Sequence, residues 1–225
     1  MKASAVVPAY NEADRIRRVL DAVESSALVD QVIVVDDGSD DKTAAVAASH
    51  NGALVIRLAR NQGKAAALAA GVRWAKNEVV VFLDADLVGL TDHHVDDLVS
   101  PVLSGEVDMT VGQFKGGRGW TTLWQRLVPA ISGQRAMRAA DFGAIPNVAR
   151  TGFGVELAIT RHALRQGLRT RLVYLPGMTH VMKEEKRGLV RGLRDRSIMY
   201  AQMLRSALGN GYHHLPETAQ ERDQG

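Results

Sequence analysis

The sequence of 225 residues contains no cysteine, which excludes a disulfide framework and any metal site built on thiolates. No apolar run approaches the roughly 20 residues that a membrane-spanning helix needs, and the first residues show no apolar core of a secretory signal. The net charge is modest, at +3 for pH 7, and does not by itself indicate a nucleic-acid partner. We expect a cytoplasmic protein, because a chain without cysteine fits a reducing compartment.

Residues 1–90 alternate between short apolar runs and stretches of helical composition. The apolar runs are 4–10, 31–37, 53–58 and 78–87, and the helical stretches between them are 15–26, 43–52 and 64–77. Apolar strands that alternate with helices predict an α/β fold, in which a mostly parallel central sheet is covered by helices on both faces. The chain length suits one large domain.

Polar side chains stand at the end of every one of these apolar runs or directly after it. They are Tyr10, Asn11 and Glu12; Asp36 and Asp37; Arg60, Asn61, Gly63 and Lys64; and Asp84 and Asp86. Ligands of such sheets bind outside the carboxyl ends of the strands, so these residues predict one shared site. The alternative is local structure, because Asp36 and Asp37 suit a turn around Gly38. Asp40 and Asp41 are expected to cap the helix that follows, with Ser39 or Asp40 as its N-cap.

Asp84 and Asp86 end the run 78–87. Residues two apart on a strand point to the same side, so both carboxylates are expected to face one ligand. Two close carboxylates repel each other, and a divalent cation removes that repulsion. Ligands that are all oxygen suit Mg²⁺ or Mn²⁺. Gly63 and Lys64 stand at a helix start, where backbone donors and a cation can bind phosphate.

The sequence lacks the motifs of several classes of phosphate-binding protein. The segment RNQGKAAA, 60–67, has neither the glycine spacing nor the Ser or Thr of a P-loop, and no GxGxxG follows the first strand. The stretch VVVFLDADLVGL, 79–90, resembles the signature of haloacid dehalogenase-type phosphatases, in which the first Asp, here Asp84, attacks phosphate. In those enzymes the motif usually lies on the first strand, whereas three strand–helix units precede it in this chain.

Four motifs together resemble glycosyltransferase family 2, whose members are inverting enzymes with a GT-A fold. They are VVPAYNEADRI, VIVVDDGSDDKT, RNQGKAAALAAG and VVFLDAD, and they cover residues 4–88 in an order similar to that of the family. The resemblance implies that residues 1–90 bind a nucleoside-diphosphate sugar, with UDP or GDP, and that residues 91–210 bind an acceptor. It implies one domain over 1–210 and a polar tail over 211–225.

The resemblance also assigns roles to residues. It implies a nucleotide-sugar site made of Pro8, Tyr10, Glu12, Asp36, Asp37, Lys64 and Asp84. Asp84 and Asp86 form the DxD motif that holds Mg²⁺ or Mn²⁺ on the diphosphate, where the metal stabilises the leaving group as a Lewis acid. A nucleotide-sugar binder without catalytic activity is a remaining alternative.

The second half offers residues for the acceptor. The segment SGQRA, 132–136, resembles the SGxR segment of polyprenyl-phosphate sugar transferases of the dolichyl-phosphate mannose synthase type. This places Ser132 and Arg135 beside an acceptor phosphate. The alternative is a plain helix start with a solvated arginine, because apolar residues over 120–138 recur near helical spacing. The same stretch has the Trp and Arg composition of a membrane-interfacial segment.

Glu156 is expected to open a helix after the glycines of TGFG, 151–154. A carboxylate at a helix N-terminus complements the helix dipole, which is a purely structural role. In the family an acidic residue near this place often serves as catalytic base. A hydroxyl acceptor needs such a base, whereas an ionised acceptor phosphate needs little help.

The region after 170 is expected to form the last strand and a loop over the site. This region contains a lone histidine, and such a residue is more often a local structural residue than a ligand. By the resemblance, a histidine here completes the metal site or contacts the diphosphate, and a basic loop neutralises phosphate. The residues concerned are His180, Lys183, Lys186 and Arg187. His93 and His94, on a helix predicted over 91–104, are expected at the surface.

Residues 189–208 carry an apolar stripe opposite arginines, which predicts a basic amphipathic helix. This helix is expected to pack on the domain, to form a homodimer, or to lie on anionic lipid at the inner face of the membrane. The first prediction for the acceptor is a polyprenyl phosphate or another lipid-linked compound at the membrane surface. The second is a soluble hydroxyl compound or a polysaccharide precursor.

Overall fold

The computed structural model describes residues 1–50, 52–113, 132–151 and 154–180. The strands are β1 (Ala3–Ala9), β2 (Val29–Asp36), β3 (Ala53–Arg57), β4 (Val79–Phe82), β5 (Leu87–Val88), β6 (Met109–Gln113), β7 (Arg135–Arg138), β8 (Thr170–Tyr174) and β9 (Thr179–His180). The helices are α1 (Ile16–Glu24), α2 (Thr43–Ala48), α3 (Lys64–Val72), α4 (Asp92–Leu103), α6 (Ala139–Gly143), the 3₁₀ helix η2 (Val148–Arg150) and α7 (Val155–Gln166).

The main sheet has seven strands in the order β3-β2-β1-β4-β7-β6-β8. The strands β1 to β4 pair in parallel, and β6 pairs in parallel with β8. Strand β7 runs antiparallel to both of its neighbours, β4 and β6. The predicted mostly parallel α/β sheet is therefore confirmed, and β5 and β9 form a separate antiparallel pair.

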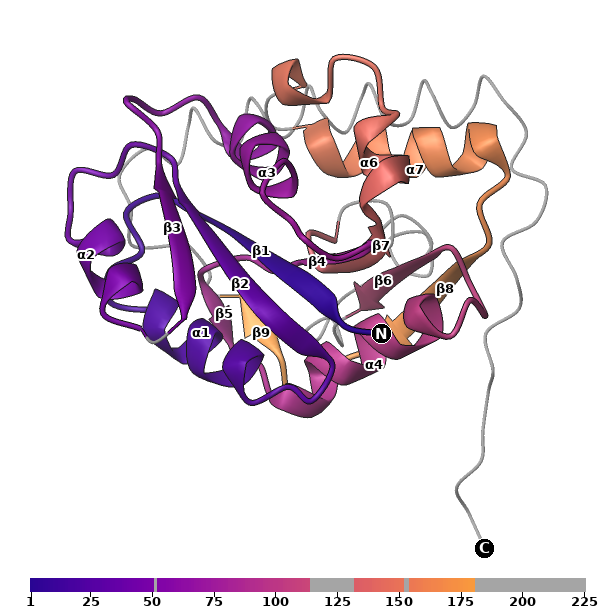
Figure 1. Ribbon diagram of the computed structural model, residues 1–225, viewed down its shortest axis with the longest axis horizontal. Helices are drawn as coiled ribbons and strands as arrows, with labels where there is room; N and C mark the ends of the chain where they lie inside the picture. The colour runs from indigo at the N-terminus through magenta and orange to yellow at the C-terminus, as the bar shows by residue number, and fades with distance from the viewer. Residues whose placement is uncertain (51, 114–131, 152–153, 181–225) are drawn as a thin grey trace, which may run out of the picture. The chain divides into compact units, whose positions relative to one another are not determined.

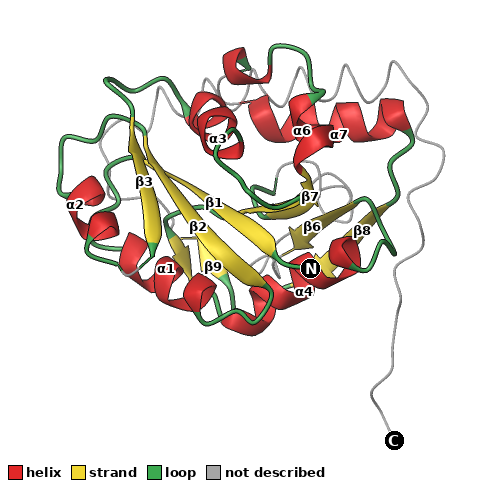
Figure 2. Ribbon diagram, viewed as in Figure 1, coloured by secondary structure: helices red, strands yellow, loops and turns green. Residues whose placement is uncertain are grey.

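Apolar side chains on both faces of the sheet explain why helices cover both. Along β4, Val79 and Val81 belong to one buried cluster, whereas Val80 and Phe82 belong to the other, because neighbouring residues of a strand point to opposite faces. Helices α1, α2 and α4 pack on the first face and α3, α6 and α7 on the second (Figures 1 and 2). Each fully buried large aliphatic side chain contributes roughly 1.5–3 kcal/mol.

Five local predictions differ from the structure. Strand β4 ends at Phe82, so Asp84 and Asp86 follow the strand instead of lying on it. The predicted helical stretch 120–138 ends as strand β7, since Arg135–Arg138 insert between β4 and β6. The expected last strand is β8, but Thr179–His180 of the expected loop form β9, which pairs with β5.

The fourth difference concerns His94, which is only 6% exposed. Its Nδ1 accepts a hydrogen bond from Thr91 N at 3.2 Å, and its N donates to Thr91 Oγ1 at 3.3 Å. This capping box at the start of α4 draws the imidazole back onto the chain and out of solvent. Thr91 is the N-cap of α4.

The fifth difference concerns the start of α2, where the expected N-cap, Ser39 or Asp40, is wrong, whereas Asp41 binds the helix start as expected. Asp41 Oδ1 accepts a hydrogen bond from Thr43 N at 2.9 Å, and the residue before the helix, Lys42, makes no side-chain cap. The carboxylate therefore satisfies one of the N–H groups that a helix start leaves without a partner.

The chain divides into compact units 1–180 and 181–225, and the second lies outside the described residues. The same holds for 114–131, which includes the two tryptophans of the expected interfacial segment. The domain boundary at 210 and the C-terminal amphipathic helix therefore stay predictions. Among the described residues, no helix is both long and apolar enough to cross a lipid bilayer.

Candidate active site

The loop after β1 is fastened to the loop after β2. Asn11 N donates to Ser39 Oγ at 2.9 Å, and Asp40 N donates to Asn11 Oδ1 at 3.0 Å. Asn11 has a φ of 56°, a left-handed conformation that Asn adopts more readily than most residues. Glu12 is 7% exposed and accepts a hydrogen bond from Arg15 Nη1 at 2.6 Å. Tyr10 remains 42% exposed beside these fixed residues.

Asp37 holds the loop that leads into α3. Its Oδ1 accepts from Gln62 N and its Oδ2 from Gly63 N, both at 2.8 Å. The same carboxylate thus fixes the backbone just before Lys64, where α3 begins. The predicted contact of Asp37 with a nucleotide stays a prediction, and this loop-holding role is one that the sequence did not indicate.

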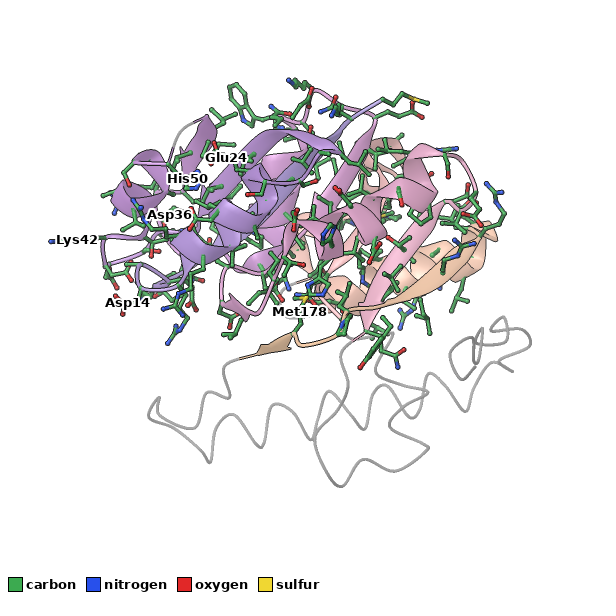
Figure 3. The ribbon with its side chains drawn as sticks, turned by 90° about the horizontal axis from the view of Figure 1, so that it is seen from below. Asp14, Glu24, Asp36, Lys42, His50 and Met178 are labelled. Atoms are coloured by element: carbon green, nitrogen blue, oxygen red, sulfur yellow. The ribbon has the colours of Figure 1, made fainter. Side chains whose placement is uncertain are left out.

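Asp36 is fully buried at the end of β2. In Figure 3, which views the protein from below, Lys42 extends outward beyond Asp36. Its Oδ1 accepts from Ser39 N at 3.1 Å. Its Oδ2 lies 3.2 Å from Arg57 Nε, yet outside hydrogen-bond geometry. We read this contact as a charge interaction, because the distance suits an ion pair while the angle does not suit a hydrogen bond.

We expect Asp37→Ala to destabilise the fold by about 1–3 kcal/mol, because two backbone N–H groups lose their acceptor. Chemical denaturation of the purified protein measures this change. Asp40→Ala is the matched control, since Asp40 is exposed on the same loop. Equal unfolding free energies for the two variants would show that Asp37 does not hold the loop.

Lys64 joins two carboxylates that the sequence separates widely. Its Nζ contacts Asp84 Oδ1 and lies 2.8 Å from Glu156 Oε1. The three side chains are 26%, 20% and 16% exposed, respectively, so solvent screens them only partly. Burial lowers the pKa of Lys64, but the charges of Asp84 and Glu156 outweigh it, so the pKa lies above its ordinary value. Lys64 is therefore a firmly charged ammonium between β4 and α7.

Asp84 has a second partner that the sequence did not indicate. Gln134, which is fully buried, donates from Nε2 to Asp84 Oδ2 at 2.9 Å and accepts from Ser132 Oγ at 3.1 Å. Gln134 lies inside the SGQRA segment, and that motif was the signal that could have pointed to it.

Arg135 is buried, at 1% exposure, which corrects the alternative of a solvated arginine at a helix start. Its Nε donates to Ser132 O and its Nη1 to Thr160 Oγ1, both at 2.8 Å. Burial lowers its pKa to about 10, and the charge of Glu156 offsets part of that effect. Its role at an acceptor phosphate stays a prediction, and its burial and its bond to Thr160 favour a part in holding α7.

Asp86 is the second carboxylate of the DxD turn, and it is partly exposed. The hydrogen bond from Arg15 to Glu12 raises the pKa of Arg15, and the charge of Asp86 adds to this effect. The next residue, Leu87, pairs with His180 between β5 and β9. The topology therefore brings the backbone of His180 beside the DxD turn, and the expected role of this histidine at a metal or diphosphate stays a prediction.

The residues present fit a hard divalent cation. Both Asp side chains of the turn offer oxygen ligands and are partly exposed. The described residues contain no group of three or more His, Asp or Glu side chains that could hold a metal by themselves. The protein would thus supply part of the coordination shell of the metal ion, and a bound diphosphate or water would supply the rest, as is common for Mg²⁺. Lys183, Lys186 and Arg187 lie outside the described residues.

Comparison with known proteins decides the family. The family model described as glycosyl transferase family 2 matches residues 4–163. The chain belongs to glycosyltransferase family 2. This membership favours the glycosyltransferase prediction over the phosphatase alternative, and it agrees with a GT-A fold.

Individual relatives share part of this chain. It is 35% identical over 120 residues to glucosyl-3-phosphoglycerate synthase of Mycobacterium tuberculosis. The aligned residues cover 49% of this chain and 37% of that protein. It is 38% identical over 93 residues to undecaprenyl-phosphate 4-deoxy-4-formamido-L-arabinose transferase of Edwardsiella ictaluri. The aligned residues cover 37% of this chain and 29% of that transferase. The matched part of this family 2 chain thus spans less than half the length of these relatives.

A solved structure covers more of the chain. Glucosyl-3-phosphoglycerate synthase from Mycobacterium tuberculosis, in complex with Mn²⁺, UDP-glucose and phosphoglyceric acid, superposes with a TM-score of 0.74 at 28% identity. The superposition covers 94% of this chain and 81% of that one.

Proposed function

We propose that this protein is a metal-dependent inverting glycosyltransferase, which moves a sugar from a nucleoside-diphosphate sugar to an acceptor that carries phosphate. The observation that carries the proposal is the Lys64–Asp84–Glu156 cluster at the carboxyl edge of the sheet, in a chain of family 2. A cation and two carboxylates are the groups that a diphosphate leaving group, a metal and an acceptor need within one site.

The donor is proposed to lie across the loops after β1, β2 and β4. Asp86 and His180, with Asp84, are the proposed metal ligands, and bound Mg²⁺ or Mn²⁺ would stabilise the diphosphate as it leaves. The DxD turn and the start of α3 bring Asp84 and Lys64 together, so Lys64 can meet a phosphate or sugar oxygen. UDP is the favoured nucleotide, because the superposed structure was solved with UDP-glucose and Mn²⁺.

The first candidate for the acceptor is a lipid-linked phosphate at the membrane surface. It is supported by the similarity to the undecaprenyl-phosphate transferase of Edwardsiella ictaluri and by the predicted basic amphipathic helix over 189–208. An ionised phosphate oxygen is its own nucleophile, so Glu156 would then mainly orient Lys64.

The second candidate is a small soluble phosphorylated hydroxyl acid. A specific observation favours it, namely the superposition over 94% of the chain on an enzyme solved with phosphoglyceric acid. A hydroxyl acceptor must lose a proton as it attacks, and Glu156 is the carboxylate of the cluster that can take this proton.

A donor screen tests the proposed function. Thermal unfolding is followed with UDP, GDP and their sugars, each with Mn²⁺ and with a chelator. We expect one nucleotide with Mn²⁺ to raise the midpoint, because a ligand at 100 times its Kd adds about 2.7 kcal/mol of apparent stability. No shift with any nucleotide would overturn the proposal.

A further inference from the structure

Gly133 and Gln134 lie directly against the Lys64–Asp84 ion pair, just before β7 begins, and Ser132 binds Gln134. A Cβ atom placed on Gly133 would lie 2.5 Å from Asp84 Oδ2 and 2.5 Å from Lys64 Nζ. The backbone of Gly133 is not left-handed, so any residue could adopt its conformation. Glycine is therefore needed at this position for space, which the ion pair occupies.

Gln134 supplies the second half of this arrangement. Its amide donates to Asp84 Oδ2 at 2.9 Å, and its Oε1 accepts from Ser132 Oγ at 3.1 Å. These two bonds together define which way the amide points, because only its nitrogen can donate to a carboxylate. The side chain is fully buried, so water does not compete for either bond.

Asp84 is consequently held from two sides. Lys64 contacts Oδ1 and Gln134 binds Oδ2, so the carboxylate cannot rotate without losing a charge-assisted hydrogen bond. Lys64 in turn reaches Glu156 Oε1 at 2.8 Å. One chain of polar contacts thus runs from Ser132 through Gln134, Asp84 and Lys64 to Glu156.

We propose that Ser132, Gly133 and Gln134 form a positioning segment for the reaction, which seats the Asp84–Lys64 pair and thereby fixes Glu156 relative to the DxD turn. The proposal rests on the proposed function for its chemistry. None of the three residues needs to touch the reacting atoms. The segment acts through Asp84 and Lys64, whose placement to within a fraction of an ångström decides how well they act on the substrate.

Two substitutions alter the segment without altering the charged residues. Gly133→Ala introduces the Cβ that would meet Asp84 and Lys64, and Gln134→Met keeps the length of the side chain but removes the donor. The added Cβ meets the ends of two side chains and not backbone atoms, so the fold should persist. Gly143→Ala, where a Cβ would meet nothing within 4 Å, and Gln166→Met, at an exposed position of α7, are the matched controls.

The expected result is a fall in kcat/KM of about tenfold or more for Gly133→Ala and for Gln134→Met, since each disturbs a hydrogen bond to a charged group. Both controls should keep the value of the unaltered protein. The loss of kcat/KM caused by Gln134→Met should not add to the loss caused by Lys64→Met. The double variant Lys64→Met/Gln134→Met should be within about twofold of Lys64→Met alone, because both changes break the same chain of contacts.

Additive effects in this cycle, or single variants with unaltered kcat/KM, would overturn the positioning role. Crystal structures of the two single variants give a measurement that does not depend on activity. They should show Lys64 Nζ displaced from Asp84, and an unchanged contact in both would also overturn the proposal. If the unaltered protein neither binds a nucleotide nor transfers a sugar, the proposed function fails, while the crystal structures still decide the positioning.

Discussion

Asp86→Ala is expected to reduce sugar transfer by at least about 100-fold, because a Lewis acid at the leaving group contributes several kcal/mol. The same change should abolish the binding of Mn²⁺ in the presence of UDP, which electron paramagnetic resonance of the metal measures directly. Thermal unfolding should show that the variant remains folded, since the Asp86 side chain is partly exposed in a turn after β4.

Asp97→Ala, at an exposed position of α4, is the control for loss of a carboxylate. It should keep both transfer and Mn²⁺ binding. Full activity of Asp86→Ala in excess chelator would contradict the assignment of the DxD turn to metal and diphosphate.

Glu156→Gln is expected to separate the two acceptor classes. With a hydroxyl acceptor, loss of the base should lower kcat by about 10²- to 10⁴-fold. With a polyprenyl phosphate, the nucleophile is already ionised, and the fall should stay below about tenfold. Steady-state rates with each acceptor, at saturating donor, give the comparison.

The substitution is suitable because glutamine keeps the size of the side chain and an oxygen that can still accept from Lys64. Glu78→Gln, an exposed carboxylate just before β4 and thus at the opposite end of that strand from Asp84, is the control. A large fall with the lipid phosphate and none with the hydroxyl acid would contradict the roles given to Glu156.

The strands that the sequence predicted correctly are those with continuous apolar runs. Strands β1, β2 and β4 are buried on both faces, so their residues are apolar without alternation, and this pattern cannot be produced by an amphipathic helix. The polar residues that follow these strands are brought to one edge because the strands are parallel. This is why Glu12, Asp37 and Asp84 could be predicted as members of one edge.

Strand β7 could not be predicted in the same way. Its sequence RAMR begins and ends with arginine, and Arg135 is buried through hydrogen bonds that only the tertiary structure supplies. The antiparallel insertion of β7 between β4 and β6 brings Gln134 to Asp84. No local pattern encodes that contact, and the same applies to the contact between Lys64 and Glu156.

The geometry of the DxD turn differs from the prediction, and its metal chemistry stays a prediction. We expected Asp84 and Asp86 to share one side of a strand, but the strand ends at Phe82. Asp84 contacts Lys64 and Gln134, whereas the charge of Asp86 contributes to the raised pKa of Arg15. Two carboxylates remain near the end of β4, where a diphosphate can meet both through one metal ion.

Calorimetric titration of UDP into the protein tests the central claim most directly. The account predicts saturable binding at one site in the presence of Mn²⁺, strong weakening by a chelator, and loss in Asp86→Ala. GDP is titrated in parallel, because the sequence left both nucleotides open. Absence of binding for both nucleotides with Mn²⁺ present, in protein shown to be folded, would contradict the account.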